Sequence, residues 1–536
     1  MPLLPIDLQR TVQELRDVRT AEARAAFDAC VQWCTGEGLG VPIHEVEQGL
    51  LDRVMGFGVA LLSLWLAHRL PLSIPATLTH GRASYRFGGF QLQAAHTRLG
   101  VVMYERPAYG RVHGNGPATL APFDAAIGLA AGRMSLGVHL LAAYLAAKLP
   151  FDQVIEVWKR LGAAYVPSKR AILGIVDRLG PAARKLIGDM PVPDDDGEIL
   201  VIQCDDKGAP MLSHAEHARR CKPHDKRAST TTQPNRAERR GELRAQRGST
   251  KAEQTRAERR SRRRGQRRPR RTKGQKSKNA RMAKVFVIYT MRQNGDGTLE
   301  GPLNKRVIAT FGSRRQAFAM AQREAAKRGY GQKPTYFLAD GSRAIWCLQQ
   351  EFFPLATACL DWFHVCEYLW TAGGTVHREG SPELAEWVHE RKAELLAGKV
   401  AKALDAMRAL KSRIGRTGPG TKGRRERLAK AIGYLDGHQM RLRYRELAKA
   451  DMDIATGAVE GAVNHVVGQR LDGSMMRWTR ARSEHVLALR CVVVNGLWDH
   501  YAEEVARQHA RIRDPVIPRI TPAHAQEPYD AVRKAA

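Results

Sequence analysis

Cysteine is scarce and scattered in this chain. Eight cysteines occur in 536 residues, at positions 30, 34, 204, 221, 347, 359, 366 and 491. No disulfide framework can be read from this spacing, which is typical of a protein kept in a reducing compartment. A secreted, disulfide-stapled scaffold is therefore not expected.

A hydrophobic run long enough to cross a bilayer is also missing. The most apolar stretch, residues 55–67, is shorter than a membrane span and contains Ser63. It predicts a buried helix. The first seven residues, Met-Pro-Leu-Leu-Pro-Ile-Asp, lack the basic region and long apolar core of a signal peptide. We therefore expect a soluble intracellular protein.

Acidic residues are in short supply, with 54 Asp and Glu against 86 Lys and Arg and a net charge of +32. Residues 219–284 alone hold 26 Lys and Arg against 5 Asp and Glu, which is 21 of that charge. Such a field attracts polyanions, and DNA or RNA is the favoured partner. The alternative is a solvated basic segment without a specific target.

The length predicts two to four domains. The regions expected from composition and periodicity are a helical N-terminal region (1–79), a small β element with a helix-turn-helix-like segment (80–190), the first part of an α/β core (198–362) with a basic insertion (214–283), an all-helical insertion (363–450), C-terminal core helices (451–510) and a tail (511–536).

The helix-turn-helix-like segment consists of two predicted helices, 151–161 and 168–179, joined by a short Gly-containing break. Ser168 is a suitable N-cap for the second helix. Lys169 and Arg170 would then begin a recognition helix. Ordinary helix packing explains the same pattern equally well.

The α/β core shows the order β-β-β-α-β-α-β. The predicted strands are 198–204, 283–291, 305–311, 335–339 and 356–361, with helices at 313–328 and 343–353. This order, in which hairpin strands are followed by right-handed crossovers, predicts a ribonuclease-H-like fold with a mixed five-stranded sheet. In that fold the first and fourth strands are neighbours.

Three carboxylates stand at informative places in this pattern. Asp205 ends the first strand, Asp340 ends the fourth, and Glu460 lies in the segment 457–465, which has helical spacing. Their mutual repulsion would be relieved by Mg²⁺ or Mn²⁺, and two such ions can catalyse phosphoryl transfer. The alternative is that the aspartates are ordinary turn residues.

Several segments carry a resemblance to a known family. They are Val201-Ile-Gln-Cys-Asp-Asp-Lys-Gly-Ala-Pro-Met211, Phe337-Leu-Ala-Asp-Gly341, Asp361-Trp-Phe-His-Val365 with Tyr368-Leu-Trp370, and Gly457-Ala-Val-Glu-Gly-Ala-Val-Asn-His465 with Met476-Arg-Trp478. With these segments the chain resembles insertion-sequence transposases of the ISKra type, which are bacterial DDE enzymes related in fold to Mutator-like transposases.

The resemblance implies a DNA transposase that cleaves and joins strands with two Mg²⁺ or Mn²⁺ ions. Asp205, Asp340 and Glu460 would be the catalytic and metal-binding residues, and His364 would belong to an Asp-x-x-His signature beginning at Asp361. It further implies double-stranded element ends and target DNA as partners, a dimer or higher oligomer, and a bacterial cytoplasmic protein associated with the nucleoid.

Some assignments stay open. The family's first motif usually reads Asp-Gly-Lys-Gly, and Asp206 replaces the first Gly here, so either Asp205 or Asp206 is the ligand. His364 is a proton shuttle, a phosphate contact or a structural hydrogen bonder. Trp478 either stacks on a base or packs against the Glu460 helix.

The residues expected to contact nucleic acid are Lys169, Arg170, Lys207, Arg262, Arg263, Arg264, Arg267, Arg268, Arg477 and Trp478, with Lys411, Arg413, Arg416, Lys422, Arg424 and Arg425 lining the site from the helical insertion. His214, His217, Cys221 and His224 could hold zinc, although their spacing is unlike that of usual zinc sites. Two other functions fit the same residues: a nuclease without strand transfer, and a non-catalytic nucleic-acid-binding protein.

Overall fold

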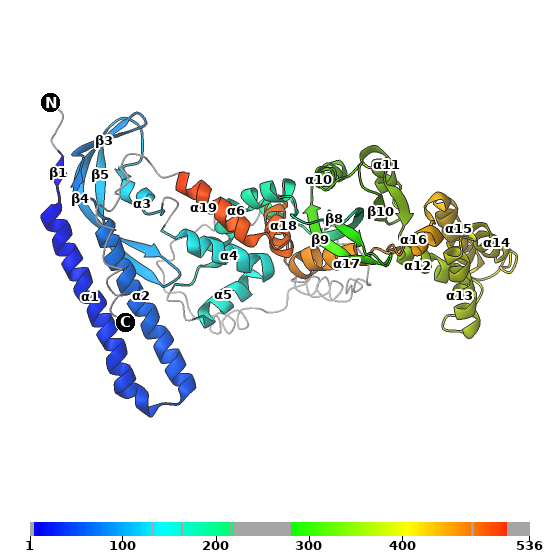
Figure 1. Ribbon diagram of the computed structural model, residues 1–536, viewed down its shortest axis with the longest axis horizontal. Coiled ribbons are helices and arrows are strands. Elements are labelled where there is room, and N and C mark those ends of the chain that lie inside the picture. The colour runs from blue at the N-terminus through cyan, green and yellow to red at the C-terminus, as the bar shows by residue number, and fades with distance from the viewer. Residues whose placement is uncertain are drawn as a thin grey trace, which may run out of the picture.

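The computed structural model describes residues 5–129, 133–161, 165–213, 216–218, 280–472 and 476–511. The molecule is elongated: a long helical hairpin stands at one end, a five-stranded sheet lies near the middle, and a group of helices forms the other end (Figure 1). The basic stretch between Arg219 and Asn279 and the tail after Arg511 lie outside the described residues.

The N-terminal unit joins two long helices to a small antiparallel sheet. Helices α1 (Gln9–Thr35) and α2 (Ile43–Arg69) form the hairpin, as predicted. The sheet has the order β3-β4-β5-β6, with strands Thr77–His80, Ala83–His96, Val101–His113 and Thr119–Leu120. A two-stranded ribbon, β1 (Ile6–Asp7) with β2 (Ser73–Ile74), closes the base of the hairpin. These elements and α3 (Pro122–Ala126) share a hydrophobic core that runs from Leu8 to Leu129.

Helix α2 is less buried than its sequence predicts. It is long and apolar enough to cross a membrane by length and composition alone, so the expectation that no run of that length occurs is wrong. Its C-terminal part packs on the small sheet, where the Ser63 hydroxyl donates to the Met103 carbonyl. Leu61 and Trp65 are 44% and 48% exposed, however, so the expectation of a fully buried helix is wrong.

The next helices belong to the larger core. Helices α4 (Leu136–Lys148), α5 (Phe151–Arg160) and α6 (Lys169–Gly188) bury apolar faces in the cluster that includes the central sheet. The Ser168 hydroxyl accepts a hydrogen bond from the Ala171 amide, which confirms the predicted N-cap. Helix α6 was predicted to end at residue 179, but it continues past Pro181 to Gly188, nine residues further. It continues because its second half packs in the same core.

The central sheet has the order β11-β10-β7-β8-β9. Its strands are β7 (Ile199–Pro210), β8 (Ala280–Gln293), β9 (Leu299–Thr310), β10 (Thr335–Ala339) and β11 (Thr357–Leu360). The first three are antiparallel, whereas β10 is parallel to both β7 and β11. The predicted mixed five-stranded sheet and the adjacency of its first and fourth strands are confirmed.

Helices cover both faces of this sheet, which is why its strands are apolar on both sides. Helix α10 (Arg314–Lys327) begins with a capping box formed by Ser313 and Gln316. Its Phe318 packs on Phe286 and Phe337, and α11 (Arg343–Phe352) follows on the same side. We call this the α10 face.

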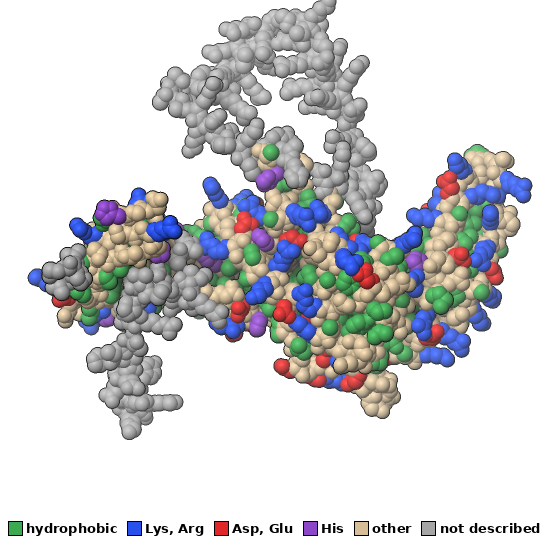
Figure 2. Space-filling view, turned by 90° about the horizontal axis from the view of Figure 1, so that it is seen from above, with side chains coloured by type: hydrophobic (Ala, Val, Ile, Leu, Met, Phe, Trp, Pro, Cys, Tyr) green, Lys and Arg blue, Asp and Glu red, His purple; other side chains and the backbone are tan. Residues whose placement is uncertain are grey.

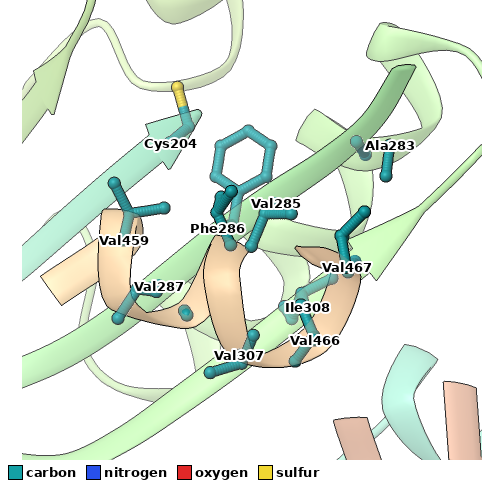
Figure 3. Close-up of a cluster of buried hydrophobic side chains, with 14 of the residues drawn as sticks. Cys204, Ala283, Val285, Phe286, Val287, Val307, Ile308, Val459, Val466 and Val467 are labelled. Carbon is teal, nitrogen blue, oxygen red and sulfur yellow. The ribbon is translucent and has the colours of Figure 1, made fainter. Parts of the chain in front are cut away.

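The opposite face is covered by α17 (Gly457–Val463) and the π-helical segment η3 (Asn464–Asp472). Figure 3 shows Val459, Val466 and Val467 of this segment lying over Val285, Val287 and Val307 of β8 and β9. We call this the α17 face.

The free edge of β9 is covered by side-chain hydrogen bonds. Helix α18 (Arg480–Val494) ends at Asn495, whose side chain accepts from the Val307 amide at 2.7 Å and donates to the Val307 carbonyl at 2.9 Å. Pairing these backbone groups keeps the edge from accepting another strand. Helix α19 (Trp498–Arg511) completes this layer.

The all-helical insertion follows β11. It contains α12 (Trp362–Gly373), α13 (Pro382–Leu396), α14 (Val400–Ala409), α15 (Thr421–Asp436) and α16 (Tyr444–Lys449). A 3-10 turn, Gln439–Arg441, precedes the short α16. Figure 1 places these helices at the end of the molecule opposite the N-terminal hairpin.

Candidate active site

Three aspartates follow three neighbouring parallel strands. The last parallel pairs are Ala339 with Cys204 and Ala339 with Leu360, so Asp205, Asp340 and Asp361 are the next residues at one edge of the sheet. The Asp361 amide still donates to the Ala339 carbonyl at 2.9 Å. The predicted closeness of Asp205 and Asp340 follows directly from this register.

Strand alternation separates Asp205 from Asp206. β7 stays paired with β8 through both residues, with Asp205 opposite Val285 and Asp206 opposite Lys284. Asp205 therefore shares the α17 face with Gln203 and Val285, whereas Asp206 points to the α10 face. There Asp206 forms an ion pair with Arg314 at the start of α10. Of the two residues, Asp205 is therefore the one on the face of the Glu460 helix, whereas Asp206 has a cationic partner on the other face.

The environment of Asp205 disfavours its charge. Burial raises its pKa to about 6, the carboxylates of Asp340 and Asp206 add to the rise, and a hydrogen bond from the Asp206 amide opposes it. The His364 imidazolium also opposes it. A carboxyl group held at such a pKa beside another carboxylate is a typical cation-binding arrangement.

The turn after Asp340 is fixed by the helical insertion. The Asp340 carboxylate accepts from the Ser342 amide at 2.9 Å. A Cβ at Gly341 would lie 2.1 Å from the Tyr434 ring of α15, so only glycine fits there. His438 contacts the Gly341 carbonyl at 3.2 Å. The insertion therefore supports the position of Asp340.

Asp361 is fully buried and holds His364. Its Oδ2 accepts from the His364 amide at 3.0 Å and lies 2.6 Å from His364 Nδ1. Burial would raise the pKa of Asp361, but its bonds with His364 and Thr456 lower it. The bond to Asp361 in turn raises the pKa of His364 to about 9. His364 is therefore a cation at neutral pH, which favours a phosphate contact or a structural role over a proton acceptor.

Glu460 lies on the first turns of α17 and is exposed. Burial raises its pKa, the Asp361 carboxylate adds to the rise, and His364 opposes it. His364 is thus electrostatically coupled to Asp205 and to Glu460. Within the described residues, no group of three or more His, Cys, Asp or Glu side chains is close enough together to hold a metal ion. The structure therefore pairs Asp205 with Asp340 but does not bring Glu460 into a common ligand cluster with them.

Mg²⁺ and Mn²⁺ prefer hard oxygen ligands, and the carboxylates of Asp205 and Asp340 are ligands of that kind. A cation there would remove the mutual repulsion that helps to raise the pKa of Asp205. In this conformation the two carboxylates that the sheet register places together are those of Asp205 and Asp340.

The expected nucleic-acid contacts differ in their surroundings. Lys169 is ion-paired with Asp152, and Arg170 is exposed. Lys207 is half-buried on the same sheet face as Asp205. Arg477 pairs with Glu216 at 3.0 Å and is 56% exposed. Arg262, Arg263, Arg264, Arg267 and Arg268 lie outside the described residues, as do His214, Cys221 and His224 of the proposed zinc site.

Trp478 does not offer a face for base stacking. It is 3% exposed, its indole N–H donates to the Leu471 carbonyl at 3.0 Å, and its ring packs against Phe151 and the Arg470 guanidinium. Burial of the ring contradicts the stacking interpretation, and the packing partners of the ring are Phe151 of α5 and Arg470 of η3.

The far end of the helical insertion is strongly basic. Residues 411–430 contain eight Lys and Arg but only one acid, Glu426. Figure 2 shows Lys and Arg side chains gathered at this end of the molecule. Lys411, Arg416 and Lys422 are exposed, and none of them forms an ion pair within the part of the chain that the structure describes. Arg425 instead donates to the Ile414 and Gly415 carbonyls and shapes the loop.

Two residues near the site were not predicted from the sequence. Gln203 is 0% exposed inside β7 and bonds to the Glu460 helix, and Thr456 bonds to Asp361. Gln203 did carry a signal, since it is the one polar residue in the apolar run Ile199-Leu-Val-Ile-Gln-Cys204. The sequence carried no comparable signal for Thr456, apart from threonine being a common capping residue before a helix.

No protein-family model matches the chain, and no curated protein is significantly similar to it. What the site can do follows from its own residues: paired strand-end carboxylates, a cationic histidine and a basic surface.

Proposed function

We propose that this chain is a DNA transposase that cleaves and joins phosphodiester bonds in a metal-dependent reaction. The observation that carries the proposal is the register of β7, β10 and β11, which sets Asp205 beside Asp340 at one sheet edge. The strand order supports a ribonuclease-H-like core. Insertion-sequence DDE transposases, which the motifs resemble, are the class in which these features occur together.

Asp205, Asp340 and Glu460 would hold Mg²⁺ or Mn²⁺, and the bound ions would activate the attacking oxygen and stabilise the leaving one. The imidazolium of His364 attracts the DNA phosphate and balances the charge of the neighbouring carboxylates. Lys207 adds a cation on the same face as Asp205. Arg314 keeps Asp206 on the opposite face, so Asp206 does not compete for the ion.

The proposal is tested by nicking of supercoiled plasmid with Mg²⁺ or Mn²⁺. Asp340→Asn and Glu460→Gln should abolish metal-dependent nicking, because each removes a charged ligand. Glu503→Gln, an exposed acid on α19, is the control and should nick like the wild type. Equal nicking by the wild type and Asp340→Asn would exclude this active site.

Strand transfer separates a transposase from a nuclease of the same fold. A labelled oligonucleotide with a free 3′-hydroxyl, incubated with the plasmid, should become covalently joined to it. Release of free ends without joining would favour the nuclease.

Double-stranded DNA is the proposed partner of the basic surface on the insertion. Exchange of Lys411, Arg416 and Lys422 for Gln should weaken DNA binding and reduce the slope of log K against log salt by about 0.9 for each phosphate that the protein no longer neutralises. The control is Arg408→Gln, because Arg408 is already paired with Asp405 and Asp436. A triple variant with the wild-type slope would place the DNA elsewhere. If the enzyme acts at two DNA ends, its active form would further have to be a dimer or higher oligomer.

A further inference from the structure

The segment that leads into the Glu460 helix is held by a buried glutamine. Gln203 Oε1 accepts from the Val459 amide at 3.1 Å, and its Nε2 donates to the Ala455 carbonyl at 3.4 Å and to the Tyr289 hydroxyl at 3.1 Å. Tyr289 donates onward to the Asp453 carboxylate at 2.7 Å. The amide of Gln203 thus spans both ends of the segment 455–459.

The same segment is held from the other side by Asp361. Its Oδ1 accepts from the Thr456 amide and from the Thr456 hydroxyl, each at 2.8 Å. The Trp362 amide donates to the Ile454 carbonyl at 3.0 Å. Gln203 and Asp361 are both 0% exposed, so water does not compete for these bonds.

These bonds matter because α17 itself has only seven residues before it continues into η3. Isolated helices of that length are unstable in water, so the place of α17 is set by what it is attached to. Glu460 directly follows Val459, whose amide is bound to Gln203. Gln203 in turn lies two residues before Asp205 on β7, and Asp361 follows β11, the strand beside the one that ends at Asp340.

We propose that Gln203 and Asp361 are positioning residues of the active site. They attach the Glu460 helix to the strand ends that carry Asp205 and Asp340, and neither of them contacts DNA or metal. This inference rests on the proposed function. Asp361 thereby has two roles: it anchors α17 through Thr456, and it orients the His364 ring through the contact with Nδ1.

The test compares Gln203→Met with Gln349→Met in the full-length protein. Gln349 is also buried, at 4% exposure, but it lies on α11 and donates to the Phe353 carbonyl away from Glu460. Both variants lose a buried amide of the same size. Nicking of supercoiled plasmid in Mn²⁺ should show kcat reduced roughly 10²-fold in Gln203→Met, the loss that a misplacement of about 1 Å can cause.

Two further readouts distinguish positioning from general stability. In Gln203→Met the KM for plasmid should be unchanged and the Mn²⁺ concentration for half-maximal rate should rise, whereas Gln349→Met should keep wild-type values of both. If the two variants lose kcat equally, the loss is one of stability and the proposal fails.

Thr456 provides an independent test of the Asp361 contact, and it also serves if Gln203→Met does not fold. Thr456→Val keeps the shape but removes the hydroxyl that donates to Asp361, and Thr456→Ser restores it. We expect Thr456→Val to lose kcat and Thr456→Ser to keep it. Wild-type kcat in Thr456→Val and Gln203→Met, with Glu460→Gln inactive, would overturn the positioning role and leave the proposed function intact. Equal nicking by the wild type and Glu460→Gln would instead remove the proposed function.

Discussion

Replacement of Asp205 by Asn should stabilise the metal-free protein at pH 8. A buried carboxyl group whose pKa is raised to about 6 favours the folded state when it is neutral and opposes it when it is charged. The stability it contributes is therefore present below the unfolded pKa, near 4, and is lost as the pH rises through 6. Asn keeps an acceptor for the Asp206 amide and carries no charge.

The size of the effect follows from the pKa shift. A rise from 3.8 to about 6, at 1.36 kcal/mol per pKa unit, corresponds to about 3 kcal/mol at pH 8. For a unit of 150–250 residues this amounts to roughly 6–12 °C in Tm. At pH 4 the carboxyl group is neutral in the folded protein, so the variant and the wild type should melt alike.

Thermal melting in EDTA at pH 4 and pH 8 measures this difference. Asp206→Asn is the matched control: it removes the carboxylate paired with Arg314, so it should lower Tm at pH 8 rather than raise it. Added Mg²⁺ should raise the Tm of the wild type and not that of Asp205→Asn. A variant that is no more stable than the wild type at pH 8, or equally shifted at both pH values, would refute the account of Asp205.

Two other substitutions test the packing around the site. Gly341→Ala should cost about 1–3 kcal/mol through overpacking against Tyr434, whereas Gly433→Ala on α15, where a Cβ meets nothing within 4 Å, should not lower the Tm; equal melting of the two variants would contradict the contact. Arg328→Met should cost about 3–5 kcal/mol because it removes the buried guanidinium that pairs in a bidentate way with the half-buried Asp196. Urea denaturation measures this loss, and a change below 1 kcal/mol would contradict a buried ion pair.

Much of the α/β core could be predicted from local pattern. The apolar runs that became β7, β8 and β10 are bounded by turn residues, and the Asn294-Gly-Asp-Gly297 turn separates β8 from β9. The order of strands and helices then restricts the sheet topology. That order is enough to expect Asp205 beside Asp340.

The local sequence pattern did not show which residues are buried by contacts with residues far away in the chain. Trp478 became a core residue because Phe151 and Arg470 enclose its ring, and Phe151 is far away in the sequence. Helix α6 passes Pro181 because tertiary packing compensates for the lost hydrogen bond.

The choice between Asp205 and Asp206 also needed the tertiary structure. Adjacent residues on a doubly covered strand look alike in sequence, and only the register with β8 assigns them to opposite faces.

The sequence by itself determined the basic character of the chain, its helices and strands, and the carboxylates that end two neighbouring strands, because charge and periodicity are properties of the chain in one dimension. Only the tertiary structure decided how Glu460 is held. Its short helix depends on Gln203 and Asp361, which lie 256 and 95 residues away from the groups they bind. Hydrogen bonds over such separations exist only once the sheet has assembled, so no local pattern can encode them.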